Sequence, residues 1–114
     1  MATIYKICPA ALWRAAEEQG VFAGSGDDIR DRFIHFSTAG QVSDTARRHF
    51  AGVGGLMLVA VEASRLGPAL RYERSRHGAL FPHLYGDLDP AAVLWAKPMP
   101  LGGDGRHLLP DLAP

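Results

Sequence analysis

The order of the strand and helix patterns constrains the fold of this chain more than any other feature. Two strand-then-helix pairs open the sequence, and the later strand patterns follow one another with no helical pattern between them. A parallel doubly wound sheet needs a helical crossover between its parallel strands. The sequence therefore predicts an α+β domain with two flanking helices.

The first strand-helix pair lies at the N-terminus. Residues Thr3 to Cys8 alternate between apolar and polar side chains, which predicts a strand. Pro9 suits the first turn of a helix, and Gly20 suits the end of one. The apolar face of this helix is expected to carry Leu12, Trp13 and Ala16.

The second pair follows a polar segment. Residues 23–31 are rich in Gly, Ser and Asp, so they are expected to form a surface loop. Arg32 to Phe36 alternates as a strand does and leads directly to Thr38 and Gln41, which have the spacing of a capping box. The sequence therefore predicts a helix that starts near Thr38. Its buried face is expected to carry Val42, Ala46 and Phe50.

The later part of the chain is expected to be mostly extended. Leu56 to Glu62 is a nearly continuous apolar run and predicts a central strand, with Leu70 to Glu73 as a shorter partner across a turn. Residues 74–90 show no clear period, and Ala92 to Ala96 predicts a last strand.

Two proline residues, Pro98 and Pro100, confine the chain beyond that strand to a sheet edge or to coil. We therefore expect a single domain over residues 1–101 and a loosely ordered tail over residues 102–114.

The charge balance excludes several classes of function. The chain has 12 basic and 12 acidic residues, which argues against the broad basic surface of a duplex-binding protein. All basic residues except Lys6 and Lys97 are arginines. Arginine suits phosphate and carboxylate ligands, although a GC-rich genome would enrich it equally.

The cellular location can also be addressed from the sequence. The apolar run from Leu56 to Val61 is far shorter than the roughly 20 residues of a membrane span, and the N-terminus lacks the pattern of a secretory signal. Cys8 is the only cysteine, so no disulfide can form within the chain. We expect a cytoplasmic protein in which Cys8 packs or caps, with a catalytic thiol as the less favoured alternative.

The first candidate site is the strand that contains His35. In a strand, Phe33, His35 and Ser37 share one face and the apolar Ile34 and Phe36 share the other. The predicted helix start after this strand would offer free backbone N–H groups to a phosphate. The alternative is that His35 bonds a neighbouring carbonyl and that Ser37 or Thr38 only caps the helix.

The second candidate site spans Glu73 to Gly86. It holds two arginines, two histidines and Tyr85 among apolar anchors, in a segment without a regular period. Polar side chains on an anchored loop are a common way to build a site. The alternative is a packed loop in which Tyr85 bonds the backbone. A structural metal is not expected, because His77 and His83 have no further ligand pattern around them.

The chain resembles a bacterial family called domain of unknown function 952. The resemblance covers roughly residues 3–100, with several motifs in the same order. These motifs are Ile4-Tyr5-Lys6-Ile7, the helix with Trp13, the segment from Phe33 to Thr38, and Glu73 followed by Phe81-Pro82-His83-Leu84-Tyr85-Gly86.

That family is in turn distantly similar to the ADP-ribosyltransferase superfamily, which includes NAD-consuming RNA 2'-phosphotransferases. The resemblance implies small split sheets and an NAD cleft in which His35 contacts a ribose with help from Ser37. The transferases add a catalytic glutamate late in the chain, whereas the last glutamate here is Glu73. The phosphotransferase branch uses arginine and histidine instead.

These observations leave three functions open. The first is an NAD-dependent transferase-like enzyme that binds NAD or a related nucleotide, with His35, Glu73 and His83 as its catalytic residues. The second is a noncatalytic module that binds a nucleotide or small anion in the same cleft, and the third is a structural protein-interaction domain. The candidate cofactor-binding residues are Arg32, Ser37, Thr38, Arg48, Arg74, Arg76 and Tyr85.

Overall fold

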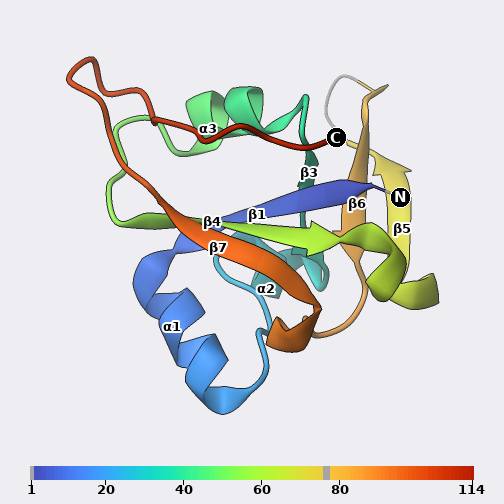
Figure 1. Cartoon of the computed structure of the whole chain (residues 1–114). Coiled ribbons are helices and arrows are strands. Elements are labelled where there is room, and N and C mark those ends of the chain that lie inside the picture. The colour runs from blue at the N-terminus through green and yellow to red at the C-terminus, as the bar shows by residue number, and fades with distance from the viewer. Residues whose placement is uncertain (1, 76–77) are drawn as a thin grey trace.

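The computed structural model describes residues 2–75 and 78–114. In these residues two small antiparallel sheets combine with helices, which confirms the α+β class (Figure 1). The four-stranded sheet has the order β3-β1-β4-β7 and consists of β1 (Thr3–Pro9), β3 (Ser37–Thr38), β4 (Leu56–Glu62) and β7 (Val93–Met99). The three-stranded sheet has the order β2-β6-β5 and consists of β2 (Ile34–His35), β6 (Leu80–Leu84) and β5 (Leu70–Arg74).

Helices lie on both sides of the four-stranded sheet. The α-helices are α1 (Ala10–Gln19), α2 (Asp27–Asp31) and α3 (Val42–His49). Short 3-10 helices are η1 (Ala63–Arg65), η2 (Gly67–Ala69) and η4 (Pro90–Ala92). Figure 1 shows α1 and α3 on opposite sides of β1 and β4. No helix in the described part of the chain is long and apolar enough to cross a membrane.

The apolar run in β4 is buried on both faces of its sheet. Leu58 and Ala60 pack in the core cluster that includes α3, whereas Val59 and Val61 pack in the cluster that includes α1. β4 also pairs with β1 on one side and with β7 on the other. Burial on both faces explains why the run does not alternate, and the prediction of a central strand is confirmed.

The first helix follows the sequence pattern with one exception. Trp13 and Ala16 are buried as expected, but Leu12 is 46% exposed and lies outside the core. Gly20 ends the helix in the left-handed conformation with φ 78°, and its N–H bonds the Ala16 carbonyl. The side chain of Trp13 contacts Phe22, at 5.5 Å between ring centroids. The helix therefore covers one face of the four-stranded sheet.

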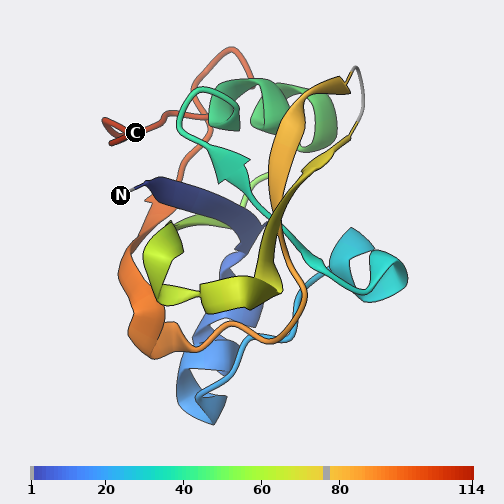
Figure 2. The ribbon, with the colours of Figure 1, turned by 90° about the vertical axis from the view of Figure 1, so that its right-hand side faces the viewer.

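The predicted surface loop over residues 23–31 is wrong in its second half. Asp27–Asp31 forms α2, which projects beside the three-stranded sheet (Figure 2), and its Asp28 side chain is buried. Asp28 Oδ2 also accepts the Ser25 N–H at 3.0 Å. Gly24 is required here, because a Cβ at that position would lie 2.7 Å from the Cβ of Asp28. The contacts of the Asp28 carboxylate therefore order residues 23–31, whose composition alone suggests coil.

The strand and helix expected around residues 32–50 are also corrected. The strand divides into β2 and β3, which belong to different sheets, and the helix begins at Val42 instead of Thr38. Half of the predicted capping box is present, since Gln41 Oε1 accepts the Thr38 N–H at 3.0 Å. The Gln41 N–H bonds the Thr38 carbonyl in a turn. Neither N–H is therefore free for a phosphate.

The second sheet was only partly predicted. β5 does not pair with β4, because η1 and η2 separate the two strands and β5 pairs with β6 instead. The period of β6 is obscured by Pro82, which usually disfavours a central strand. The Pro82 carbonyl still accepts the Phe36 N–H at 2.9 Å, so pairing continues there. His83 consequently lies on a strand, whereas the sequence suggested an irregular loop.

The segment 102–114 runs back across the molecule toward the N-terminus (Figure 1). Leu109 and Leu112 pack against the core cluster that includes α3. The Tyr5 hydroxyl donates to the Ala113 carbonyl at 2.7 Å. The tail thus packs on the face of the sheet that α3 also covers.

Candidate functional site

The two histidines singled out in the sequence are direct neighbours across the three-stranded sheet. The register of β2 and β6 pairs His35 with His83, and their ring centroids are 5.5 Å apart. Alternation in these strands places Ile34 and Leu84 on the opposite, buried side. The same pairing that closes the core therefore brings two imidazoles together on its outer face.

His35 is held by a buried carboxylate. Asp28 Oδ1 accepts both the His35 N–H at 3.0 Å and the ring Nδ1–H at 2.6 Å. Asp28 Oδ2 lies 2.6 Å from the Lys6 ammonium, and both of these side chains are buried. Burial alone would raise the pKa of Asp28, but the hydrogen bonds from His35 and the charge of Lys6 outweigh it and lower the pKa to about 2. Asp28 is therefore an ionised acceptor that makes Nδ1 the donor.

His83 is held by a second carboxylate. Its Nδ1 lies 2.9 Å from Glu73 Oε1, and the Tyr85 hydroxyl donates to the same oxygen at 2.7 Å. The bonds from Tyr85 and His83 lower the pKa of Glu73, and the Glu73 carboxylate raises the pKa of Tyr85. The Arg71 guanidinium lies 5.1 Å from the centroid of the Tyr85 ring. Both histidines thus have Nδ1 directed at an ionised carboxylate.

Phe33 lies at the centre of this cluster. Its ring centroid is 4.5 Å from that of His35, 4.1 Å from that of His83 and 5.2 Å from that of Tyr85. His83 is 5% exposed, whereas 34% of the His35 side chain is exposed. Phe33 and the two histidines therefore form a continuous aromatic surface from which His35 is the more accessible base.

The Nε2 atoms of His35 and His83 differ in their contacts. His35 Nε2 lies 3.0 Å from Asp31 Oδ2, an exposed carboxylate at the end of α2. For His83 Nε2, the described residues provide no hydrogen-bond partner. An imidazole whose Nδ1–H is fixed by a carboxylate presents Nε2 for proton transfer. The arrangement is suited to general acid-base chemistry with two histidines.

A cavity of about 210 Å³ borders the cluster. Its lining includes Asp28, Arg32, Phe33, Gly86 and Asp87. Arg32 has a left-handed backbone conformation with φ 65°, which is uncommon for a residue with a side chain. The volume is below the roughly 300–1,000 Å³ of typical ligand pockets. The cavity is therefore small for a ligand pocket.

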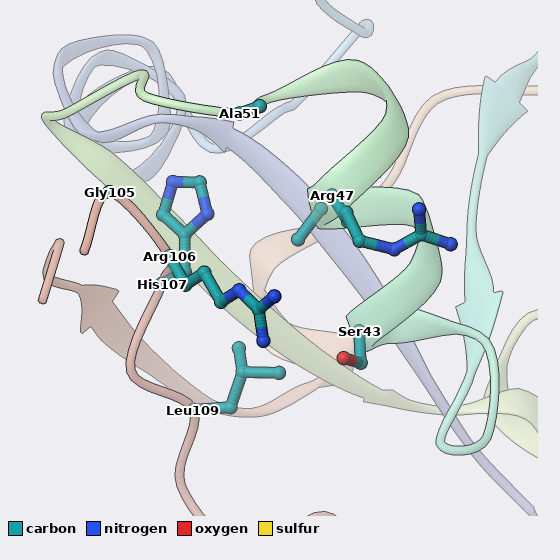
Figure 3. Close-up of a pocket in the computed structure, with 8 residues that line it drawn as sticks. Ser43, Arg47, Ala51, Gly105, Arg106, His107 and Leu109 are labelled. Atoms are coloured by element: carbon teal, nitrogen blue, oxygen red, sulfur yellow. The ribbon is translucent and has the colours of Figure 1, made fainter.

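A second hollow of about 140 Å³ lies between α3 and residues 105–109 (Figure 3). Its basic side chains already have partners, since Arg47 pairs with Asp44 and Arg106 Nε lies 3.9 Å from Asp104 Oδ2. His107 Nε2 donates to the Val53 carbonyl at 2.8 Å. This hollow is therefore a weaker candidate for a site than the paired histidines.

Several predicted site residues lie away from the cluster. The Ser37 hydroxyl is buried and lies 3.0 Å from the Thr45 hydroxyl, on the strand that pairs with β1. Arg48 bonds Asp44 on α3, and Arg74 donates to the Gly78 carbonyl. Thr38 is engaged with Gln41 as described above, and Arg76 lies outside the described residues.

Three residues of the site are not predicted by the sequence pattern, namely Lys6, Asp28 and Asp31. One signal for Lys6 was available, because it lies between Ile4 and Cys8 on a face that must be buried. A buried ammonium requires a counter-charge. The pattern does not reveal which of the 12 acidic residues supplies it. In the described part of the chain, no group of three or more His, Cys, Asp or Glu side chains could hold a metal ion.

Comparisons with known proteins agree with this fold. The crystal structure of protein CC0527 from Caulobacter crescentus is 45% identical to the chain, with 93% of each chain covered and a TM-score of 0.89. The solution NMR structure of CC0527 is 46% identical, covers 93% of this chain and 91% of its own, and has a TM-score of 0.84. Among curated proteins no match is found. Residues 7–96 match the family described as protein of unknown function (DUF952), and the chain therefore belongs to that family.

Proposed function

We propose that the paired histidines form a nucleotide-binding site, with NAD as the first candidate, and that they assist a transferase-like reaction by proton transfer. The observation that carries this proposal is the pair of carboxylate-bound imidazoles, with Nδ1 of His35 on Asp28 and Nδ1 of His83 on Glu73. Carboxylates of this kind orient a histidine and stabilise its protonated form. Such a pair can donate and accept protons at one bound substrate.

Different parts of a nucleotide match different parts of this surface. The partly exposed ring of Phe33 is a flat surface on which a base or a nicotinamide ring can stack. Arg71 lies over the Tyr85 ring, and Arg32 lines the adjacent cavity, so both are available to phosphate groups. The superfamily resemblance implies a ribose beside His35, and the phosphate attached to that ribose can reach the same imidazole. The proposal does not use Ser37, because its hydroxyl is buried against Thr45.

Glu73 acts in this proposal by holding His83 and Tyr85. Its Oε1 accepts a hydrogen bond from each of them, and its side chain is 36% exposed. Residues 74–114 contain no further glutamate that could act as a catalytic base. This feature favours a second candidate function, in which the site binds a nucleotide or small anion without turnover. A third candidate is a structural interaction domain, favoured by the low exposure of His83.

Thermal unfolding with NAD, ADP-ribose and AMP separates binding from the structural role. A ligand at about 100 times its Kd stabilises a protein by roughly 2.7 kcal/mol, which for a domain of this size is a melting shift on the order of 10 degrees. We expect such a shift in the wild type and its loss in a folded His35→Ala variant. His49→Ala is the matched control, because His49 is an exposed histidine of α3. No shift with any ligand at millimolar concentration would eliminate nucleotide binding.

Release of nicotinamide from bound NAD, with water taking its place on the ribose to give ADP-ribose, distinguishes the enzyme from the binding module. We expect release by the wild type and by His49→Ala, and none by His35→Ala or His83→Ala. Retention of intact NAD by a wild-type protein that binds it would support the noncatalytic module instead.

A further inference from the structure

The exposed edge of His35 is occupied by a carboxylate of its own chain. Asp31 Oδ2 lies 3.0 Å from His35 Nε2, while Asp28 Oδ1 lies 2.6 Å from Nδ1. His35 is therefore arranged as a receptor for two oxygen anions, one of which the protein holds in its interior and one at its surface.

The two carboxylates have very different attachments. The Asp28 side chain is 1% exposed and is bound by Lys6 and by the N–H groups of Ser25 and His35. The Asp31 side chain is 32% exposed, and its other partner is the surface residue Arg30, whose Nε lies 3.0 Å from Asp31 Oδ1. Asp31 can leave His35 by a change of rotamer and keep Arg30 as its partner. Asp28 cannot leave His35 in this way, because the buried Lys6 ammonium would lose its counter-charge.

We propose that Asp31 occupies the place of the ligand's oxygen anion, and that a phosphate or carboxylate group of the ligand displaces it from His35 Nε2. This inference rests on the proposed function and deepens it by naming the group that anchors the ligand. Aromatic surface for the rest of the ligand lies beside this position, on the ring of Phe33. Asp28, already neutralised by Lys6, stays in place and keeps the ring oriented.

The charges around His35 determine how strongly Asp31 competes. Lys6, Arg30 and Arg71 supply positive charge, and Asp28, Asp31 and Glu73 supply negative charge. Removal of the Asp31 charge makes the local net charge more positive by one unit, next to the position of the incoming anion. Because a like charge about 4 Å away opposes binding of an anion, its removal should raise the affinity for an oxygen anion about tenfold, which corresponds to about 1.4 kcal/mol.

The test uses inorganic pyrophosphate as the oxygen-anion probe and adenosine as a neutral probe. Binding is measured by NMR titration of the histidine ring resonances at constant ionic strength, in the wild type, Asp31→Asn and Asp27→Asn. Asp27 is the matched control, because it belongs to the same helix and pairs with Arg30 at 3.4 Å without contacting His35. We expect Asp31→Asn to lower the pyrophosphate Kd about tenfold, Asp27→Asn to leave it within about twofold, and neither to change adenosine binding.

The outcomes separate this inference from the proposed function. An unchanged or higher pyrophosphate Kd in Asp31→Asn, including no binding at all, overturns the role of Asp31. If NAD still binds in a manner that needs His35, the proposed function survives that result. Tighter pyrophosphate binding without any binding of NAD, ADP-ribose or AMP supports the role of Asp31 and rejects the nucleotide proposal. The tighter binding of pyrophosphate must also be lost in the double variant His35→Ala/Asp31→Asn.

Discussion

Asp28 holds both the backbone and the side chain of His35 through one oxygen atom. Oδ1 accepts the His35 N–H at 3.0 Å and its Nδ1–H at 2.6 Å. The same contact therefore fixes the course of β2 and the orientation of the imidazole. Because Lys6 binds the other oxygen of Asp28, the site on the sheet is linked to a buried ion pair below it.

Substitution of Asp28 by asparagine should destabilise the fold strongly. The change leaves the Lys6 ammonium, which is 6% exposed, without its counter-charge. Breaking a buried ion pair in this way costs about 3–5 kcal/mol. Urea unfolding followed by circular dichroism measures the loss, with Asp27→Asn as a surface control expected to change the free energy of unfolding by less than about 0.5 kcal/mol. A loss below about 1 kcal/mol for Asp28→Asn would contradict the importance of the pair.

Acid should weaken the fold in a defined pH range. The pKa of Asp28 is about 2 in the folded protein, against a usual value of 3.8. A group with a depressed pKa stabilises the fold fully above its unfolded pKa, and that contribution disappears as the pH falls through the folded value. Between about pH 4 and pH 2 the fold should lose about 2 kcal/mol from this group.

Unfolding in urea at pH 5, 3 and 2 measures this loss. Four further carboxyl groups have lowered pKa values and act in the same direction, namely Asp31, Asp44, Glu62 and Glu73. The Asp28→Asn variant should therefore lose less stability over this range than the wild type. Equal losses in the two proteins would show that Asp28 is not responsible.

Cys8 should be unreactive in the folded protein. Burial raises the pKa of its thiol to about 11, with Lys6 lowering it and Asp28 raising it to smaller extents, and the residue is 0% exposed. A thiol that is neutral and buried reacts slowly with a disulfide reagent. We expect labelling with Ellman's reagent at pH 8 to be complete in urea and negligible without it. Rapid labelling under native conditions would reopen the alternative of a catalytic thiol.

Ser37 and His35 should behave differently when each is changed to alanine. The Ser37 hydroxyl bonds Thr45, so its removal should cost about 1 kcal/mol of stability and leave nucleotide affinity unchanged. His35→Ala should instead abolish binding. Titration of NAD into both variants provides the measurement. Loss of binding in a folded Ser37→Ala protein would instead support a ligand-binding role for Ser37.

The packing of the C-terminal segment against the sheet should depend on the Tyr5 hydroxyl. Its hydroxyl is hydrogen-bonded to the Ala113 carbonyl, and Leu112 packs nearby on the same core cluster. Tyr5→Phe removes this bond and should cost about 1 kcal/mol. Amide hydrogen exchange should become faster in residues 109–114 and stay unchanged in β6. Unchanged exchange in the tail would show that its apolar contacts alone hold it.

The sequence was sufficient for features that depend on neighbouring residues along the chain. The apolar run of β4 and the spacing of Trp13 and Ala16 depend on burial alone, and both predictions are confirmed. The motifs around His35 and His83 also identified the family that the comparison confirms. Local patterns predict which segments are strands or helices, because periodicity follows from which side of each element is buried.

Pairing between distant segments was decided only by the tertiary structure. Nothing local indicates that β5 joins β6 instead of β4, or that a polar segment becomes α2. These outcomes depend on the contacts of particular side chains, above all on Asp28, which joins Lys6 of β1 to His35 of β2. The buried charge of Lys6 has to be neutralised, and the folded chain alone determines which acidic residue is close enough to do so.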